Sequence, residues 1–129
     1  MWEALIFLAH RKLPNITVLI DLNGLQGFGS TREVASMHEL GQRLQGFGLP
    51  VVHVDGHDHQ AIVAAGRAHP GAVIVLHTVK GKGVSFMENR MEWHYLPLSK
   101  EQYVAAVGEL EGLEKVAARE IADVRVAAV

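Results

Sequence analysis

The sequence predicts an α/β fold in which a mostly parallel sheet carries helices on both faces. Three short segments rich in β-branched residues alternate with segments of helical character; they are Ile16–Leu22, Pro50–Gly56 and Gly71–Val79. The first and third are almost continuously apolar, which is typical of strands buried on both faces of a parallel sheet. Alternating helices and strands of this kind specify parallel strands joined by helical crossovers.

Two helices are expected on either side of the first strand, one predicted from its apolar residues and the other from a capping box at its start. Residues 2–12 form an expected helix that is apolar on most sides, more than one neighbouring element would cover. Such a helix normally lies inside a fold, so its position at the start of the chain indicates that an upstream segment is missing. The next helix is expected within residues 30–48, where Ser30 and Glu33 have the spacing of a capping box.

Two further helices are expected to begin at polar caps. Asp58 caps a helix that continues to about His69. This cap explains the stretch His57–His59 more simply than a zinc site, which needs three or four converging ligands. Ser99 and Gln102 have capping-box spacing and start a last helix that continues toward the carboxyl terminus.

Composition limits the class of protein. The 129 residues suffice for one domain with one core, and 49% of them are hydrophobic, as expected for a globular chain. A formal charge of −2 gives no electrostatic footprint for nucleic acid. The absence of cysteine excludes disulfides and thiolate metal sites and fits a cytoplasmic location. The apolar run near the amino terminus is too short to span a membrane.

The first strand ends in a loop whose residues suit a hard cation. Ligands of parallel α/β sheets bind beyond the carboxyl ends of the strands. There Asn23 offers an amide oxygen, Gly24 lets the backbone turn or approach a ligand, and Leu25 offers a carbonyl. Mg²⁺ prefers oxygen ligands and often shares them with phosphates. From these residues alone, a simple Asn-Gly turn is the favoured interpretation.

The third strand ends in a long loop, residues 79–99, which has neither helical nor strand periodicity. Its start, VKGKGVS (Val79–Ser85), alternates glycine with lysine and could form an anion-binding nest, although a solvated surface turn is favoured. His94 lies in its aromatic second half, where an imidazole can donate to an anion or a sugar hydroxyl. Long loops of this kind usually carry function or are disordered.

Three stretches in order along the chain resemble one known family. WEALIFLAHRKLPNITVLIDLNGLQGFGSTREV (Trp2–Val34), VDGHD (Val54–Asp58) and HTVKGKGVSFMENRMEWHYLPLS (His77–Ser99) are similar to the thiamine-diphosphate-binding domain of transketolases. The similarity is greatest to the amino-terminal subunit of split transketolase-like enzymes. It implies that residues 1–129 form a single partial domain, the carboxyl-terminal portion of the diphosphate-binding domain.

The resemblance implies roles for four residues. Asn23 and the backbone carbonyl of Leu25 correspond to ligands of the Mg²⁺ that holds thiamine diphosphate, and Gly24 lies between them in the cofactor-binding turn. His94 corresponds to the catalytic histidine near the diphosphate and the substrate channel. Many relatives have glycine after this histidine, whereas this chain has Tyr95. The substrate of well-known relatives therefore does not transfer to this chain.

The implied activity is transfer of a two-carbon ketol unit between sugar phosphates, by a transketolase-like enzyme made of several chains. The family's GDG motif is absent, since the one Asp-Gly pair, Asp55-Gly56, belongs to VDGHD. We therefore expect one partner chain with the GDG segment and one with the pyrimidine-binding domain. The alternatives are a truncated subunit, a non-catalytic assembly or scaffold subunit that retains the fold, and a component of another thiamine-dependent synthase or dehydrogenase.

Overall fold

The computed structural model describes the backbone of residues 1–127 and the side chains of residues 1–115. The chain forms two compact units, Met1–Val79 and Lys80–Val129. We call them the amino-terminal unit and the carboxyl-terminal unit and describe each by itself. Among the described residues, none of the helices combines the length and apolar character needed to cross a bilayer.

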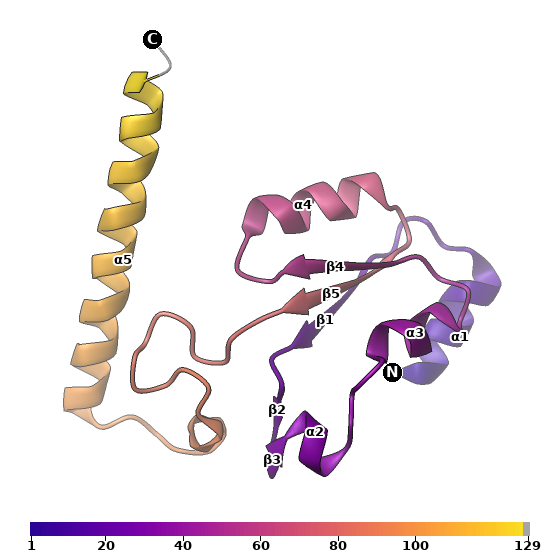
Figure 1. The fold of residues 1–129 in the computed structure, drawn as a ribbon, viewed down its shortest axis with the longest axis horizontal. Coiled ribbons are helices and arrows are strands. Elements are labelled where there is room, and N and C mark those ends of the chain that lie inside the picture. Colours follow the sequence, from indigo (N-terminus) through magenta and orange to yellow (C-terminus); the bar gives the residue numbers. More distant parts are fainter. Residues whose placement is uncertain (128–129) are drawn as a thin grey trace. The chain divides into compact units, whose positions relative to one another are not determined.

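The amino-terminal unit is built on a parallel sheet of three strands, β1 (Val18–Leu22), β4 (Val51–Asp55) and β5 (Val73–His77). Their order is β1-β5-β4, so β5 is central and both pairs are parallel (Figure 1). Leu22, His77 and Asp55 are register partners, which brings the carboxyl ends of all three strands to one edge. The predicted mostly parallel sheet is confirmed.

Helices cover both faces of this sheet. α1 (Trp2–Arg11) and α3 (Leu40–Gln45) lie on one side, and α4 (His59–Ala68) lies on the other (Figure 1). The core on the first side joins two helices to the central strand and consists of Leu5, Leu40, Leu44, Val73 and Val75. The expected arrangement of helices on both faces is therefore confirmed.

The central and edge strands differ in burial. β5 meets the expectation for a strand covered on both faces, since Val73, Ile74 and Val75 are fully buried. The same expectation for Ile16–Leu22 is wrong, because its residues alternate between half-buried and exposed in β1 and Leu19 is 54% exposed. β1 lies at the edge of the sheet, and α4 packs against β4 and β5 rather than against β1.

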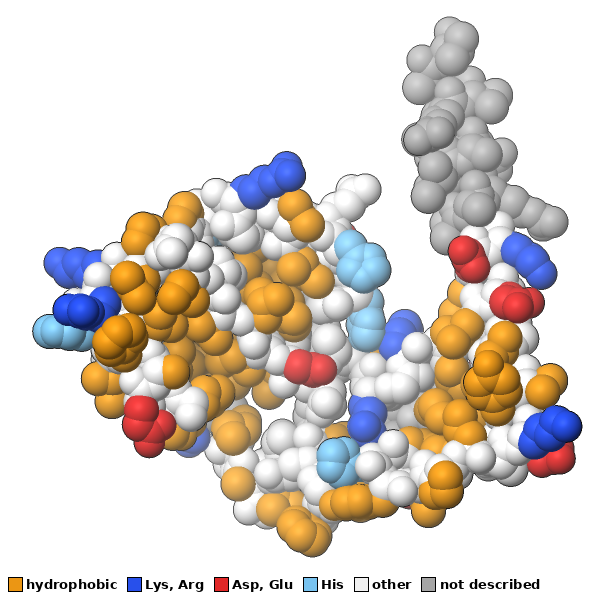
Figure 2. Space-filling view, turned by 180° about the vertical axis from the view of Figure 1, so that it is seen from behind, with side chains coloured by type: hydrophobic (Ala, Val, Ile, Leu, Met, Phe, Trp, Pro, Cys, Tyr) orange, Lys and Arg blue, Asp and Glu red, His pale blue; other side chains and the backbone are white. Residues whose placement is uncertain are grey.

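α1 also leaves apolar surface uncovered. Leu5 and Leu8 are buried, whereas Ile6 and Phe7 are 57% and 54% exposed. Figure 2 shows hydrophobic side chains gathered on the side of the amino-terminal unit where α1 lies. Exposed apolar surface of this extent typically marks an interaction site. The expected excess of apolar surface on α1 is present, whereas the expectation that such a helix is buried is wrong here, since Leu5 and Leu8 are the only buried residues of this described helix.

The single helix expected within residues 30–48 is wrong. A short antiparallel pair, β2 (Leu25–Gln26) with β3 (Gly29–Ser30), ends where this segment begins, and the segment itself forms two helices, α2 (Thr31–Val34) and α3. Between the helices, Ser36 Oγ accepts a hydrogen bond from the His38 N–H at 3.2 Å, and Glu39 has a positive φ of 61°. Such local side-chain bonds compete with helical hydrogen bonding and break the helix here.

The predicted helix caps are confirmed. Ser30 Oγ accepts from the Glu33 N–H at 3.2 Å, and Asp58 Oδ1 accepts from the Ala61 N–H at 2.9 Å. At the start of α5 (Lys100–Ala127), Ser99 Oγ accepts from the Gln102 N–H. The Gln102 side chain accepts from the Ser99 N–H in return, which completes a capping box.

The carboxyl-terminal unit consists of the long loop, a short 3₁₀ helix η1 (Met91–His94) and α5. The loop is held internally, since the Trp93 indole donates to the Phe86 carbonyl at 2.8 Å and the two rings pack edge to face. Along α5, Leu110 and Leu113 are exposed, and Figure 2 shows hydrophobic side chains on its described part.

Candidate ligand-binding groove at the carboxyl edge of the sheet

A groove of about 390 Å³ lies where β1 and β5 end in the amino-terminal unit. We call it the β1–β5 groove. Its lining residues are Leu22, Asn23, Gly24, Thr31, Arg32, Ser36, Met37, His38, His77 and Thr78. The lining combines hydroxyls, an amide, imidazoles and a guanidinium, with no acidic side chain among the described residues that form it. Its position is the one at which parallel sheets bind ligands.

Asn23 forms the turn at the rim of this groove. Its Oδ1 accepts a hydrogen bond from the Leu25 N–H at 2.9 Å, and the following Gly24 has a positive φ of 74°. The turn interpretation of Asn23-Gly24 is therefore realised in the structure. An amide oxygen has two acceptor positions, however, so Asn23 Oδ1 keeps one for a further donor or a hard cation. The turn and a ligand role are compatible.

Asp21 and Thr78 join the ends of β1 and β5 beside the groove. The Thr78 hydroxyl donates to Asp21 Oδ1 at 2.5 Å, and the Thr78 N–H donates to the Leu22 carbonyl at 3.4 Å. The Asp21 carboxylate is thus engaged within the sheet edge. This bond fixes the side chain of Thr78 at the groove wall.

Two histidines pair across β4 and β5. His53 Nδ1 and His77 Nε2 are 2.9 Å apart, and the rings stack with centroids 5.1 Å apart. His77 lines the β1–β5 groove, whereas His53 stands beside α3. The sequence pattern did not single out His77, although its position as the last residue of a buried strand is the same signal that indicated Asn23.

The stretch His57–His59 has a structural role at the end of β4. His57 Nε2 accepts from the Val79 N–H at 2.8 Å, and Asp55 Oδ1 accepts from the His57 N–H at 2.8 Å. Within the described part of the chain, no three His, Cys, Asp or Glu side chains converge as metal ligands would. His57 instead anchors the chain as it leaves β5.

In the carboxyl-terminal unit, carboxylates occupy the N–H groups of the glycine-lysine loop. Glu88 Oε1 accepts from the Gly83 N–H at 3.0 Å, and Glu109 Oε2 accepts from the Ser85 N–H at 2.6 Å. The Ser85 hydroxyl donates to the second oxygen of Glu109 at 2.9 Å. Since these donors are already satisfied within the chain, the structure favours the surface-turn interpretation over an anion-binding nest.

His94 ends η1 in the same unit. It is exposed, and its ring packs edge to face against Tyr95 with centroids 4.7 Å apart. The tyrosine that replaces the expected glycine is thus in direct contact with the histidine. The structure brings Asn23, Gly24 and Leu25 together in one turn and places His94 in the carboxyl-terminal unit.

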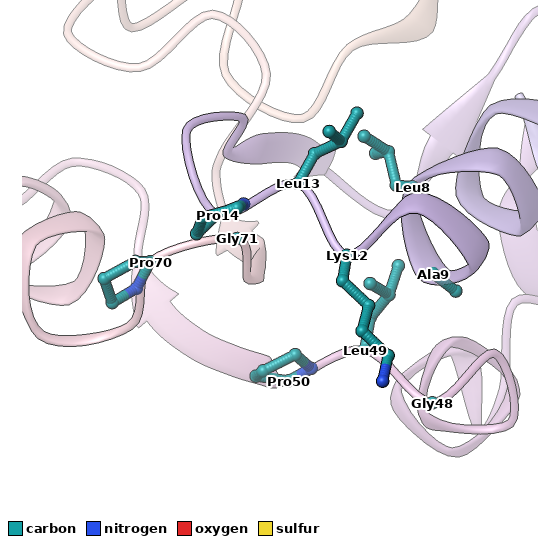
Figure 3. Close-up of a pocket in the computed structure, with 10 residues that line it drawn as sticks. All are labelled: Leu8, Ala9, Lys12, Leu13, Pro14, Gly48, Leu49, Pro50, Pro70 and Gly71. Atoms are coloured by element: carbon teal, nitrogen blue, oxygen red, sulfur yellow. The ribbon is translucent and has the colours of Figure 1, made fainter.

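A second cavity, of about 340 Å³, lies at the opposite edge of the sheet, where the strands begin (Figure 3). Its walls are mostly apolar and include Leu8, Leu49 and the ring of Pro50, with Lys12 as the one charged side chain among its lining residues. Parallel sheets bind ligands at their carboxyl edge. The polar β1–β5 groove is therefore the better candidate site.

Comparison with known proteins identifies transketolases as relatives, and no family model matches the chain. The chain is 36% identical over 116 residues to the 6-deoxy-6-sulfo-D-fructose transketolase subunit of Clostridium sp. (strain MSTE9), covering 86% of this chain and 42% of that protein. It is 35% identical over 122 residues to an apulose-4-phosphate transketolase subunit of Phocaeicola vulgatus, covering 90% and 43%.

A solved structure shares the fold. The crystal structure of transketolase from Campylobacter jejuni superposes with a TM-score of 0.74 at 24% identity and covers 85% of this chain and 18% of that one. The chain thus spans about two-fifths of the length of the two subunits that it resembles, 42% and 43%. These relatives, together with the shared fold, show that the chain belongs to the transketolase family and is similar to the subunits of split transketolases.

Proposed function

We propose that this chain is part of a thiamine-diphosphate- and Mg²⁺-dependent transketolase-like enzyme that is active only with partner chains. The enzyme transfers a two-carbon ketol unit between sugar phosphates in the cytoplasm. The observation that carries the proposal is the similarity to transketolase subunits over 86% of the chain, with Asn23 at a strand end. Residues 1–129 are one partial diphosphate-binding domain in this proposal.

The turn at the rim of the β1–β5 groove, which includes Asn23 and Leu25, fits the proposed cofactor. Asn23 Oδ1 and the Leu25 carbonyl would hold Mg²⁺, since Asn23 keeps one acceptor position beside its bond to the Leu25 N–H. Gly24 keeps this turn free of a side chain, and a Cβ there would meet no atom within 4 Å. When bound, thiamine diphosphate supplies the carbanion chemistry, while the protein supplies position and electrostatics.

His94 is proposed as the residue that meets the substrate. Its exposed imidazole can donate a hydrogen bond to a sugar hydroxyl or to a phosphate. The ring of Tyr95 packs edge to face against one side of this imidazole. Since this residue differs from the family's usual glycine, the sugar substrate is expected to differ as well.

Partner chains are supported by the relatives, which are named as transketolase subunits. One partner chain would supply the GDG segment with its aspartate metal ligand, and another the pyrimidine-binding domain. The uncovered apolar surface on α1, including Ile6 and Phe7, supports such association.

The test is cofactor titration of the assembled enzyme with an Asn23→Ala variant of this chain. We expect a Mg²⁺-dependent loss of thiamine diphosphate affinity of about tenfold or more, because the change removes a metal ligand rather than core volume. Gln42→Ala, an exposed residue on α3, is the matched control and should leave the affinity unchanged. An unchanged cofactor affinity for Asn23→Ala would mean that Asn23 has only a structural role in the turn.

A further inference from the structure

We propose that the β1–β5 groove binds a phosphate group directly, through Arg32 and through a His77 ring that is held in place by His53. The inference rests on the proposed function for the identity of the ligand, and adds to it a metal-independent phosphate contact. The ligand class is a phosphate ester or a diphosphate. Some hydrogen-bond donors of the groove are already engaged within the chain, and others remain for a ligand.

Arg32 is the uncompensated charge of the groove. The guanidinium lines it, and among the described residues Arg32 has neither an ion pair nor a side-chain hydrogen bond. The neighbouring His38, by contrast, is already paired with Glu39, with Nδ1 and Oε1 3.0 Å apart. An arginine recognises phosphate oxygens through a fork of N–H donors, which makes an unpaired one in a groove suitable for this ligand.

His77 is the second residue of the proposed contact, and its ring is hydrogen-bonded to the ring of His53. Its Nε2 is bonded to His53 Nδ1 at 2.9 Å. If His53 Nδ1–H donates, His77 accepts at Nε2 and carries its own proton on Nδ1, the ring atom that remains for a ligand. His53 thereby acts as a positioning residue, and His77 acts as the residue that contacts the ligand.

The packing of α3 keeps His53 in this position. A Cβ added at Gly41 would lie 2.7 Å from His53 Nε2 and 3.3 Å from its Cε1. The first distance is shorter than Cβ contacts in proteins and the second is tight, so alanine at this position would push the ring. Gly41 therefore leaves the space in which the His53 ring stacks on His77.

The hydroxyls and the charge of the lining agree with an anionic ligand. Thr31 and Ser36 add hydroxyl donors at the groove wall, and the Ser36 oxygen that accepts from the His38 N–H leaves its own proton free to donate. None of the described residues that line the groove carries a carboxylate. Two carboxylates contact lining residues from outside and are each engaged there: Asp21 accepts from the Thr78 hydroxyl, and Glu39 is paired with the His38 ring.

The experiment is a titration of the full chain, labelled with ¹⁵N in its histidine rings, in Mg²⁺-free buffer. The probes are inorganic pyrophosphate for a cofactor diphosphate and ribose 5-phosphate for a sugar phosphate, with ribose as the phosphate-free control. We expect both phosphates to shift the His77 ring nitrogens with dissociation constants on the order of 1–10 mM, and ribose to have no effect. Tighter binding of pyrophosphate would assign the site to the cofactor, and tighter binding of ribose 5-phosphate to the substrate.

Four variants separate the contacts. Arg32→Gln should weaken binding by about tenfold or more, as expected when one charge-assisted hydrogen bond is lost, while Arg67→Gln on α4 should not. Gly41→Ala should change the His77 ring signals before any ligand is added and should also weaken binding. The control for Gly41→Ala is His69→Gln, which alters an exposed histidine at the opposite edge of the sheet and should leave the His77 ring signals unchanged.

Two results would overturn the proposal. One is the absence of a ring-nitrogen shift with either phosphate at about 50 mM, some fivefold above the weakest expected constant. The other is equal binding by Arg32→Gln and the unaltered chain. Either result leaves the proposed function intact if Asn23→Ala still weakens the cofactor in the assembled enzyme. A response of His77 without cofactor binding or ketol transfer would reject the proposed function alone.

Discussion

Gly56 is a position where one added methyl group should disturb the edge of the sheet that carries the groove. The Gly56 N–H donates to the His77 carbonyl at 2.8 Å, so the turn after β4 runs close to the end of β5. A Cβ at this position would overlap Thr78 Cγ2 and lie 3.0 Å from Leu76 Cβ and 3.2 Å from the His77 carbonyl oxygen. The neighbours are a short side chain, a Cβ and backbone, which have little freedom to move.

The expected magnitude follows from these contacts. Overpacking of this kind costs about 1–3 kcal/mol of unfolding free energy, so we expect Gly56→Ala to destabilise the chain by that amount. Gly66→Ala is the matched control in α4, because its Cβ would meet only Ile74 Cδ1, at 4.0 Å. There the helix should gain about 0.5–1 kcal/mol from the lower flexibility of alanine.

Urea unfolding of the full chain, followed by circular dichroism, measures both changes. With a slope of about 1–3 kcal/mol per M for a small domain, the two midpoints should separate by roughly 1 M, with the wild-type midpoint between them. If Gly56→Ala unfolded at or above the wild-type midpoint, the close approach of the turn to β5 would be refuted. A loss of stability by Gly66→Ala would instead show that α4 does not pack on β5 as described.

Three further predictions concern the caps, the cofactor and the substrate. Asp58→Ala should lower the unfolding free energy by about 1 kcal/mol, because it removes the acceptor for the Ala61 N–H. Asp58→Asn keeps an acceptor oxygen and should retain most of this stability, so equal losses for the two variants would contradict the cap. The purified chain alone should bind thiamine diphosphate with Mg²⁺ weakly or not at all in calorimetry. A sub-micromolar dissociation constant, which corresponds to a binding free energy of about −8 kcal/mol or better, would contradict this expectation. In the assembled enzyme with saturating cofactor, His94→Ala should lower turnover or weaken the sugar substrate more than it affects the metal site, and unchanged kinetics would make His94 a packing residue.

Local signals in the sequence predicted the parts of the fold that depend on a few neighbouring residues. The caps at Ser30, Asp58 and Ser99 involve partners three residues away, so their spacing alone was sufficient. The burial of β5 was likewise predicted from the continuous apolar run within the strand itself. The break between α2 and α3 was not predicted, because Ser36 and Glu39 act through local backbone geometry that apolar periodicity does not reveal.

Features that depend on the pairing of distant segments could not be predicted in the same way. The edge position of β1 follows from the strand order, and an apolar run does not state which neighbours a strand has. The contact of His53 with His77 spans 24 positions and exists only because β4 and β5 pair in one register. The turn at Asn23 was predicted because its side chain bonds to a residue only two positions away.

The central claim, that this chain is one part of a multi-chain transketolase, is tested most directly by native mass spectrometry of the complex purified from its source cells through a tag on this chain. The same fractions are assayed for ketol transfer. We predict a complex that contains this chain, a partner with the GDG segment, a partner with a pyrimidine-binding domain, and bound thiamine diphosphate and Mg²⁺. Its ketol transfer should be lost when the chains are separated. A stable monomer that performs ketol transfer unaided, or a complex without the cofactor and without activity, would contradict the account.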